Sequence, residues 1–81
     1  MDAVRDAIVA LLEEEPRTVT ELTAAYCRLR LVNGWPFLTD LHNIARRTSD
    51  LHDRGVIYDT GVRRPTRFGR PSAVWAVKEV A

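Results

Sequence analysis

Between residues 39 and 77, helical periodicity gives way abruptly to strand composition, and this change restricts the fold more than any other feature of the sequence. Over residues 39–54, three side chains recur on one side at helical spacing: Ile44, Thr48 and Leu51. Gly55 follows as a stop, because glycine readily takes the left-handed backbone conformation that ends many helices. The segment therefore predicts an amphipathic helix with one buried and one exposed face.

Two short segments with strand composition follow this helix, residues 56–58 and residues 73–77. Residues 61–71 between them read as a turn-rich loop that lacks acidic side chains and carries four arginines: Arg63, Arg64, Arg67 and Arg70. This order predicts a β-hairpin with a basic tip, in which Tyr58 and Trp75 could pair across the strands. The pattern does not decide whether Val74 or Trp75 faces the core.

Two further helices are predicted upstream. The first covers residues 2–15 and has an apolar stripe, and Pro16 ends it. The second begins after Thr18, whose spacing to Glu21 matches a capping box, and runs to about residue 31. Its expected buried stripe is Leu22, Ala25, Tyr26, Leu29 and Val32. The chain thus predicts one domain over residues 1–81 with an α+β, mainly α, fold of three helices followed by a two-stranded β-hairpin.

Composition excludes several classes of function. No apolar run approaches the roughly 20 residues that span a bilayer, and the acidic N-terminus lacks signal-peptide anatomy, so we expect a cytoplasmic protein. The single cysteine, Cys27, is expected to be a half-buried apolar residue. His42 and His52 are too far apart to form an i, i+4 metal pair. We predict no catalytic residues, no metal site, no cofactor and no small-molecule substrate.

Charge is distributed unevenly along the chain. Residues 1–23 carry six acidic and two basic side chains, a net charge of −4, whereas residues 24–81 carry ten basic and five acidic ones, a net charge of +5. Such asymmetry favours a molecule that turns one face towards a polyanion. Arginine and asparagine can bind base edges, and arginine also binds phosphates. We therefore predict a DNA-binding surface on the third helix, formed by His42, Asn43, Arg46, Arg47 and Ser49, with Arg63, Arg64, Arg67 and Arg70 of the hairpin contacting the backbone or the minor groove.

The second half of the chain resembles small winged helix-turn-helix proteins of bacteriophages and prophages. The resemblance rests on an arginine-rich helix around residues 46–51, the segment at residues 54–61, the arginine-rich tip at residues 63–70 and the closing segment at residues 73–75. It implies DNA binding, with the third helix as recognition helix and residues 61–72 as wing, and it leaves the kind of DNA-binding protein open. Our leading hypothesis is a transcriptional regulator that binds double-stranded DNA in a bacterial host cell. Asp50 stands where such proteins usually have Glu, and the connection at residues 35–38 is unusual.

Alternatives remain open at the level of sequence. Trp35, Phe37 and Leu38 are expected to fold inward, but the same residues could anchor a protein partner. In that case the domain would be a protein-interaction module that docks on a host or phage protein. An excision or architectural DNA-binding factor is a further option. A homodimer is also open, because a chain this short buries a small core.

Overall fold

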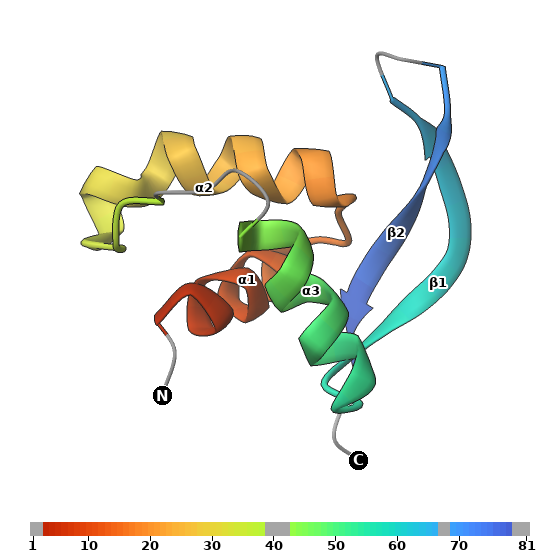
Figure 1. Ribbon diagram of the computed structural model, residues 1–81, viewed down its shortest axis with the longest axis horizontal. Helices are drawn as coiled ribbons and strands as arrows, with labels where there is room; N and C mark the ends of the chain where they lie inside the picture. The colour runs from red at the N-terminus through yellow and green to blue at the C-terminus, as the bar shows by residue number, and fades with distance from the viewer. Residues whose placement is uncertain (1–2, 39–42, 67–68, 79–81) are drawn as a thin grey trace.

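The computed structural model describes residues 3–38, 43–66 and 69–78 of the chain. Three helices precede two antiparallel strands in the order α1 (Ala3–Glu14), α2 (Val19–Asn33), α3 (Asn43–Asp53), β1 (Ile57–Pro65) and β2 (Pro71–Val77). The helices pack together, and the distal part of the hairpin extends beyond them (Figure 1). This arrangement confirms the predicted layout of three helices and a hairpin in a mainly helical α+β fold. No helix in the described parts of the chain has the length and apolar character needed to cross a membrane.

The boundaries of α2 follow the residues that mark them in the sequence. Thr18 Oγ1 accepts a hydrogen bond from the Glu21 backbone N–H at 3.2 Å, and Glu21 Oε1 accepts one from the Thr18 N–H at 2.8 Å. This reciprocal pair satisfies two N–H groups that have no partner within a helix, and it confirms the predicted capping box. Gly34 takes a positive φ of 66° and ends the helix.

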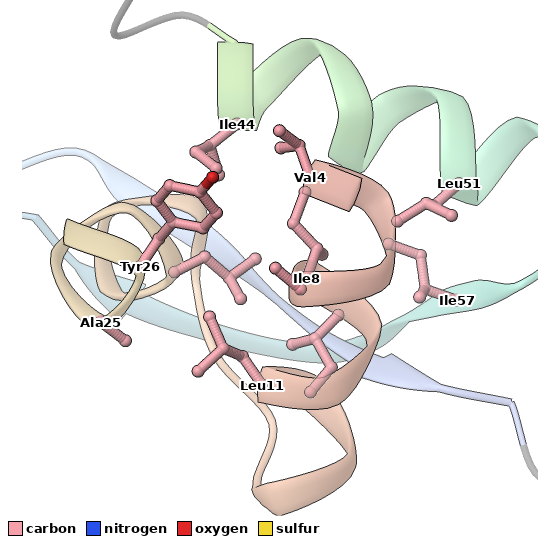
Figure 2. Packing of buried hydrophobic residues seen from close by; sticks show 11 residues of the cluster. Val4, Ile8, Leu11, Ala25, Tyr26, Ile44, Leu51 and Ile57 are labelled. Atoms are coloured by element: carbon pink, nitrogen blue, oxygen red, sulfur yellow. The ribbon is translucent and has the colours of Figure 1, made fainter. Parts of the chain in front are cut away.

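The hydrophobic core lies where the three helices meet the base of the hairpin (Figure 2). It comprises Val4, Ala7, Ile8, Leu11, Leu12, Leu22, Ala25, Tyr26, Ile44, Leu51 and Ile57. Tyr26 is fully buried, as predicted, and its hydroxyl donates a hydrogen bond to the Pro36 carbonyl at 2.5 Å. The Trp35 ring stacks on Tyr26 at 5.2 Å between centroids. Tyr26 therefore attaches the connection between α2 and α3 to the core.

The hairpin is longer than the sequence pattern indicated. Strand pairing continues to Pro65 opposite Pro71, so the predicted loop over residues 61–71 was too long. The predicted pairing of Tyr58 with Trp75 was also wrong, because Tyr58 lies opposite Ala76 and Trp75 lies opposite Asp59. Val74 is 2% exposed, whereas Trp75 is half-buried against the core cluster and contacts the His52 ring at 5.0 Å between centroids.

A bulge interrupts β1 between Asp59 and Arg63. The register shifts there from Asp59 opposite Trp75 to Arg63 opposite Ala73, so three residues of β1 lie against one residue of β2. Gly61, within the bulge, has a φ of 84°, a conformation that side chains with a Cβ rarely adopt. Such bulges bend a strand, and β1 is visibly bowed in Figure 1.

The connection between α1 and α2 is joined to the hairpin by its backbone. The Arg17 N–H donates to the Trp75 carbonyl at 3.1 Å, and the Trp75 N–H donates to the Arg17 carbonyl at 2.9 Å. These two hydrogen bonds form a β-bridge that adds one residue to the edge of β2. The hairpin is therefore attached to the helices by main-chain bonds as well as by core packing.

Three expectations about apolar side chains were wrong. Val32 is 84% exposed rather than part of the buried stripe of α2, because the helix projects past the core at its C-terminal end. Phe37 is 72% exposed rather than folded inward, whereas Trp35 and Leu38 pack against the core as expected. Cys27 is exposed rather than half-buried.

Candidate nucleic-acid interface

The predicted contact residues of α3 divide between two environments. Arg46 and Ser49 are exposed on the side of the helix opposite the core, whereas Asn43 and Arg47 are half-buried at its flank. His42 lies outside the described residues. The buried side consists of Ile44, Thr48 and Leu51, as predicted. The sequence therefore identified the orientation of α3 correctly, and the outward side that remains accessible carries Arg46 and Ser49.

Polar contacts satisfy a buried hydroxyl of α3 and join this helix to α1. Thr48 Oγ1 donates to the Ile44 carbonyl at 2.7 Å, which gives the buried hydroxyl a partner. The Asp50 carboxylate lies 2.6 Å from Arg5 Nη2 of α1 and 3.1 Å from Arg54 Nε. Asp50 thus links α3 to α1, and the two guanidinium groups offset its negative charge. A polyanion approaching α3 therefore meets less repulsion from this carboxylate than it would from an unpaired one.

The described arginines of the hairpin are exposed, and two of them form ion pairs. Arg63, Arg64 and Arg70 all have exposed side chains, and Arg67 lies outside the described residues. The tip contains no acid of its own, yet two acidic residues from outside it bind Arg63 and Arg64. These are Asp59, at the base of the same strand, and Glu21, at the start of α2.

Asp59 and Arg63 form a two-pronged ion pair across the bulge. Arg63 Nη1 lies 2.8 Å from Asp59 Oδ1, and Arg63 Nη2 lies 2.9 Å from Oδ2. Asp59 Oδ1 also accepts the Gly61 N–H at 2.9 Å. The Arg63 and Gly61 hydrogen bonds lower the pKa of the Asp59 carboxyl below its ordinary value, and the carboxylate raises the pKa of the Arg63 guanidinium. The pair stabilises the bulge conformation and occupies one edge of the Arg63 guanidinium.

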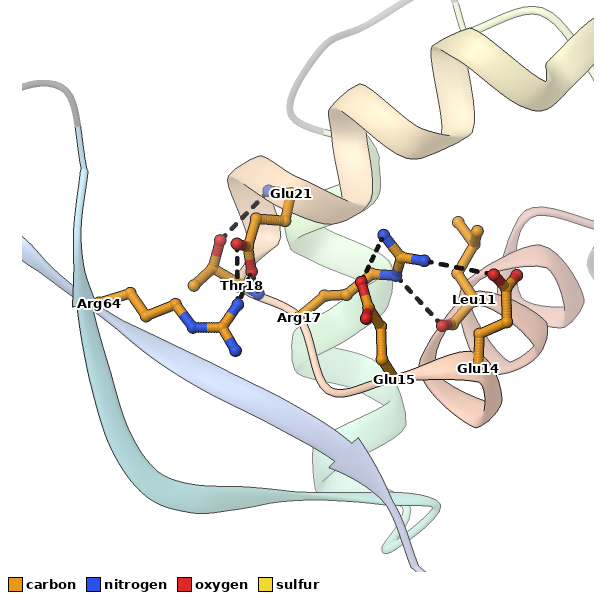
Figure 3. A network of polar contacts seen from close by, with 7 residues as sticks. All are labelled: Leu11, Glu14, Glu15, Arg17, Thr18, Glu21 and Arg64. Atoms are coloured by element: carbon orange, nitrogen blue, oxygen red, sulfur yellow. Dashed lines mark hydrogen bonds and ion pairs between the residues drawn. The ribbon is translucent and has the colours of Figure 1, made fainter.

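Arg64 connects the hairpin to the N-terminus of α2 (Figure 3). Its Nη1 lies 2.6 Å from Glu21 Oε1 and 2.8 Å from Oε2. Glu21 therefore closes the capping box with Thr18 and binds Arg64 at the same time. Partial burial acts to raise the pKa of the Glu21 carboxyl, but the Thr18 hydrogen bond and the Arg64 contacts outweigh it, so the pKa lies below its ordinary value. A groove of about 300 Å³ separates the two elements at this point, lined by Thr18, Thr20, Glu21, Arg64, Pro65 and Thr66.

Arg17 fixes the neighbouring turn in Figure 3. Its Nε donates to the Leu11 carbonyl at 3.2 Å at the end of α1. Its guanidinium also lies 3.7 Å from a Glu14 carboxylate oxygen and 3.5 Å from one of Glu15. Glu13, Glu14 and Glu15 form an exposed acidic segment at the end of α1. Arg17 offsets part of that charge close to the hairpin.

The two sets of predicted contacts are thus positioned by different parts of the chain. The exposed side of α3 is set by core packing and by Arg5, whereas the hairpin is set by its bulge and by Glu21. The sequence identifies Glu21 as a capping residue but not as a partner of Arg64, because the two residues are 43 positions apart. The charge asymmetry was the only hint, since it placed acids in the first part of the chain and arginines in the last.

No protein-family model matches the chain, and neither the curated proteins nor the solved structures contain a significant match.

Proposed function

We propose that this chain is a winged-helix protein that binds double-stranded DNA sequence-specifically, as a transcriptional regulator of phage or prophage type. In this proposal α3 enters the major groove, and the arginine-rich end of the hairpin lies along the backbone or in the minor groove. Arg46 and Ser49 would read base edges, with Asn43 and Arg47 at the flank of the helix, while Arg63, Arg64 and Arg70 would contact phosphates.

The observation that carries the proposal is a basic hairpin that extends beyond the helices, in a protein whose third helix exposes a side that bears an arginine. The hairpin extends past the helices in Figure 1, and residues 60–78 contain five basic side chains and no acid. On α3, the side that bears Arg46 and Ser49 is left accessible by the packing of the core. Phosphate attraction supplies most of the affinity of such surfaces, and side chains on a groove-binding helix supply specificity.

The ion pairs of the hairpin are compatible with this role. Both Glu21 hydrogen bonds use Nη1 of Arg64, and the Asp59 bonds use the two terminal nitrogens of Arg63. Preformed pairs hold long side chains in place before binding, which lowers the entropy lost on binding. A phosphate can then compete with, or add to, the carboxylate at each guanidinium.

The decisive experiment is a titration of random-sequence duplex DNA at about 50 mM and 200 mM salt. We expect the affinity to fall steeply with salt, and we expect Arg70→Ala to reduce the slope by about one phosphate contact, roughly 0.9 on logarithmic axes. Arg28→Ala is the matched control, because Arg28 is an exposed arginine on α2 outside the proposed interface. Affinity that does not change with salt, or an equal effect of both substitutions, would contradict the proposal.

Selection of bound fragments from random DNA then tests sequence preference. Recovery of a shared motif supports a regulator, and recovery without a motif but with strong bending of the bound fragments supports an architectural factor. If two copies bind as a two-fold dimer, inverted half-sites should lie about 34 Å apart.

A further inference from the structure

The C-terminal end of α2 presents an apolar surface that neither the core nor the proposed DNA interface uses. Leu31 is 82% exposed and Val32 is 84% exposed in its last turn, and Phe37 is 72% exposed just beyond its cap. Single exposed apolar residues are ordinary, but these three are each more than 70% exposed and lie within seven positions of the chain. We call Leu31, Val32 and Phe37 the α2-end patch.

The patch continues along α2 as a stripe at helical spacing. Ala24, Cys27 and Leu31 occupy positions i, i+3 and i+7, and all three are exposed. The opposite side of the same helix carries its buried residues Leu22, Ala25 and Tyr26. A helix with apolar residues on both sides usually has a partner on both sides. The small side chains Ala24 and Cys27 would allow another helix to approach closely, and Leu31 would act as its anchor.

Charge decides which occupant suits this surface. Residues 22–38 contain two basic side chains, Arg28 and Arg30, and no acidic one. Arg28 is exposed beside the stripe, and the Arg30 guanidinium lies 5.0 Å from the centroid of the Phe37 ring. A second copy of the chain in this place would bring four arginines together with no acid from these segments to offset them. A partner with apolar and acidic side chains would complement both the stripe and the arginines.

We propose that the α2-end patch and the Ala24–Cys27–Leu31 stripe form a docking surface for an acidic amphipathic helix of another protein. The partner's apolar side chains pack on Leu31, Val32 and Phe37, and its carboxylates lie against Arg28 and Arg30. The site is at the opposite end of α2 from the hairpin. The C-terminal end of α2 points away from the hairpin in Figure 1, whereas Glu21 at the N-terminal end contacts Arg64 of the hairpin. With 15 residues at about 1.5 Å each, α2 separates the two sites by roughly 20 Å. One chain can therefore hold DNA and a protein partner at once.

The test uses random displayed peptides of about 15 residues, long enough for four helical turns. The library is selected on the wild-type protein, and the recovered peptides are synthesised for titration. We expect them to combine apolar residues at helical spacing with Asp or Glu. We expect Leu31→Ser and Val32→Ser each to weaken binding about tenfold, because each removes a side chain that the complex buries. Arg28→Glu should weaken binding by a similar factor, and more strongly at low salt.

Controls separate this site from a general loss of fold or of DNA affinity. Val62→Ser makes the same change at an exposed position of the hairpin, and we expect it to leave peptide binding unchanged. Because Leu31 and Val32 are exposed, their serine variants should unfold at the wild-type temperature and bind duplex DNA as the wild type does. The peptide titration tests the docking surface whether or not the protein binds DNA, since peptide and DNA are titrated separately.

Three outcomes would overturn the proposal. The first is a selection that yields no peptide whose binding depends on Leu31 and Val32. The second is a set of recovered peptides without acidic residues. The third is self-association through the same surface, shown by a dimer in sedimentation that Val32→Ser abolishes and by a Cys27–Cys27 cross-link between copies.

Discussion

Arg64 on β1 and Glu21 at the start of α2 form an ion pair in which one guanidinium nitrogen lies within 2.8 Å of both carboxylate oxygens. The pair joins positions 43 residues apart and fixes the hairpin against the helices. Glu21 also caps α2, so one side chain stabilises both the start of this helix and the position of the hairpin. Four predictions concern this pair, the bulge in β1 and the exposed side of α3.

The first concerns the strength of the pair. Both side chains are partly exposed, so a double-mutant cycle of Glu21→Gln and Arg64→Ala should give a coupling of about 0.2–1 kcal/mol in urea unfolding. Gln can still accept the Thr18 N–H, so this substitution tests the charge with the cap retained. Glu21→Ala should cost about 1 kcal/mol, because it also removes half of the capping box. A coupling indistinguishable from zero would show that the pair does not stabilise the position of the hairpin, which would then depend on core packing, the Arg17–Trp75 bridge and the bulge.

The second concerns pH. The pKa of Glu21 lies below its ordinary value of 4.5 in the folded protein, so its contribution to stability is complete above pH 4.5 and is lost as the pH falls through the lowered pKa. We therefore expect the unfolding free energy of the wild type to decline more steeply than that of Glu21→Gln between about pH 5 and pH 3. Asp59 contributes in the same direction in both proteins, because its pKa is also lowered. Parallel curves for the two proteins would contradict the ion pair.

The third concerns the bulge. A Cβ added at Gly61 meets no atom within 4 Å, so the cost of a substitution there comes from the backbone conformation alone. Gly61→Ala should destabilise the protein by about 1–2 kcal/mol, as expected for a residue forced into the left-handed region. Gly61→Asn should cost less, since asparagine tolerates that region better. Thermal unfolding of the two variants measures the difference, and equal losses would mean that the bulge changes shape instead.

The fourth concerns the proposed DNA interface. Arg46→Ala should reduce the ratio between specific and random duplex affinities, because Arg46 lies on the exposed side of α3. Arg70→Ala should weaken both affinities about equally, because phosphate contacts carry no sequence information. Arg64→Ala should weaken both and also loosen the hairpin, which amide exchange in β1 would report. If Arg46→Ala and Arg70→Ala had the same effect on both affinities, the division between base and backbone contacts would be wrong.

Local rules predicted the elements of this fold well. The stripe of Ile44, Thr48 and Leu51 placed α3 correctly, and the spacing of Thr18 and Glu21 predicted the start of α2. These features depend on neighbours within four residues, so the chain itself contains the information. The same is true of Gly55, whose φ of 76° follows the end of α3 as predicted.

The predictions were wrong where segments distant in the sequence determine the structure. Residues 61–65 contain glycine and proline and read as a loop, but pairing with β2 extends the strand through them. Trp35, Phe37 and Leu38 were all expected inside, yet Phe37 is exposed whereas Trp35 stacks on Tyr26. The partners of Arg63 and Arg64 followed from the bend of the hairpin and the position of α2, which no local pattern encodes. The predicted contacts at His42 and Arg67 lie outside the described residues and remain predictions.

The backbone bridge between Arg17 and Trp75 has a mechanical consequence. Because main-chain atoms make both hydrogen bonds, a force applied to the far end of the hairpin is transmitted directly to the joint between the first two helices. A ligand that displaced the hairpin would therefore strain these two hydrogen bonds and, through them, the connection between α1 and α2.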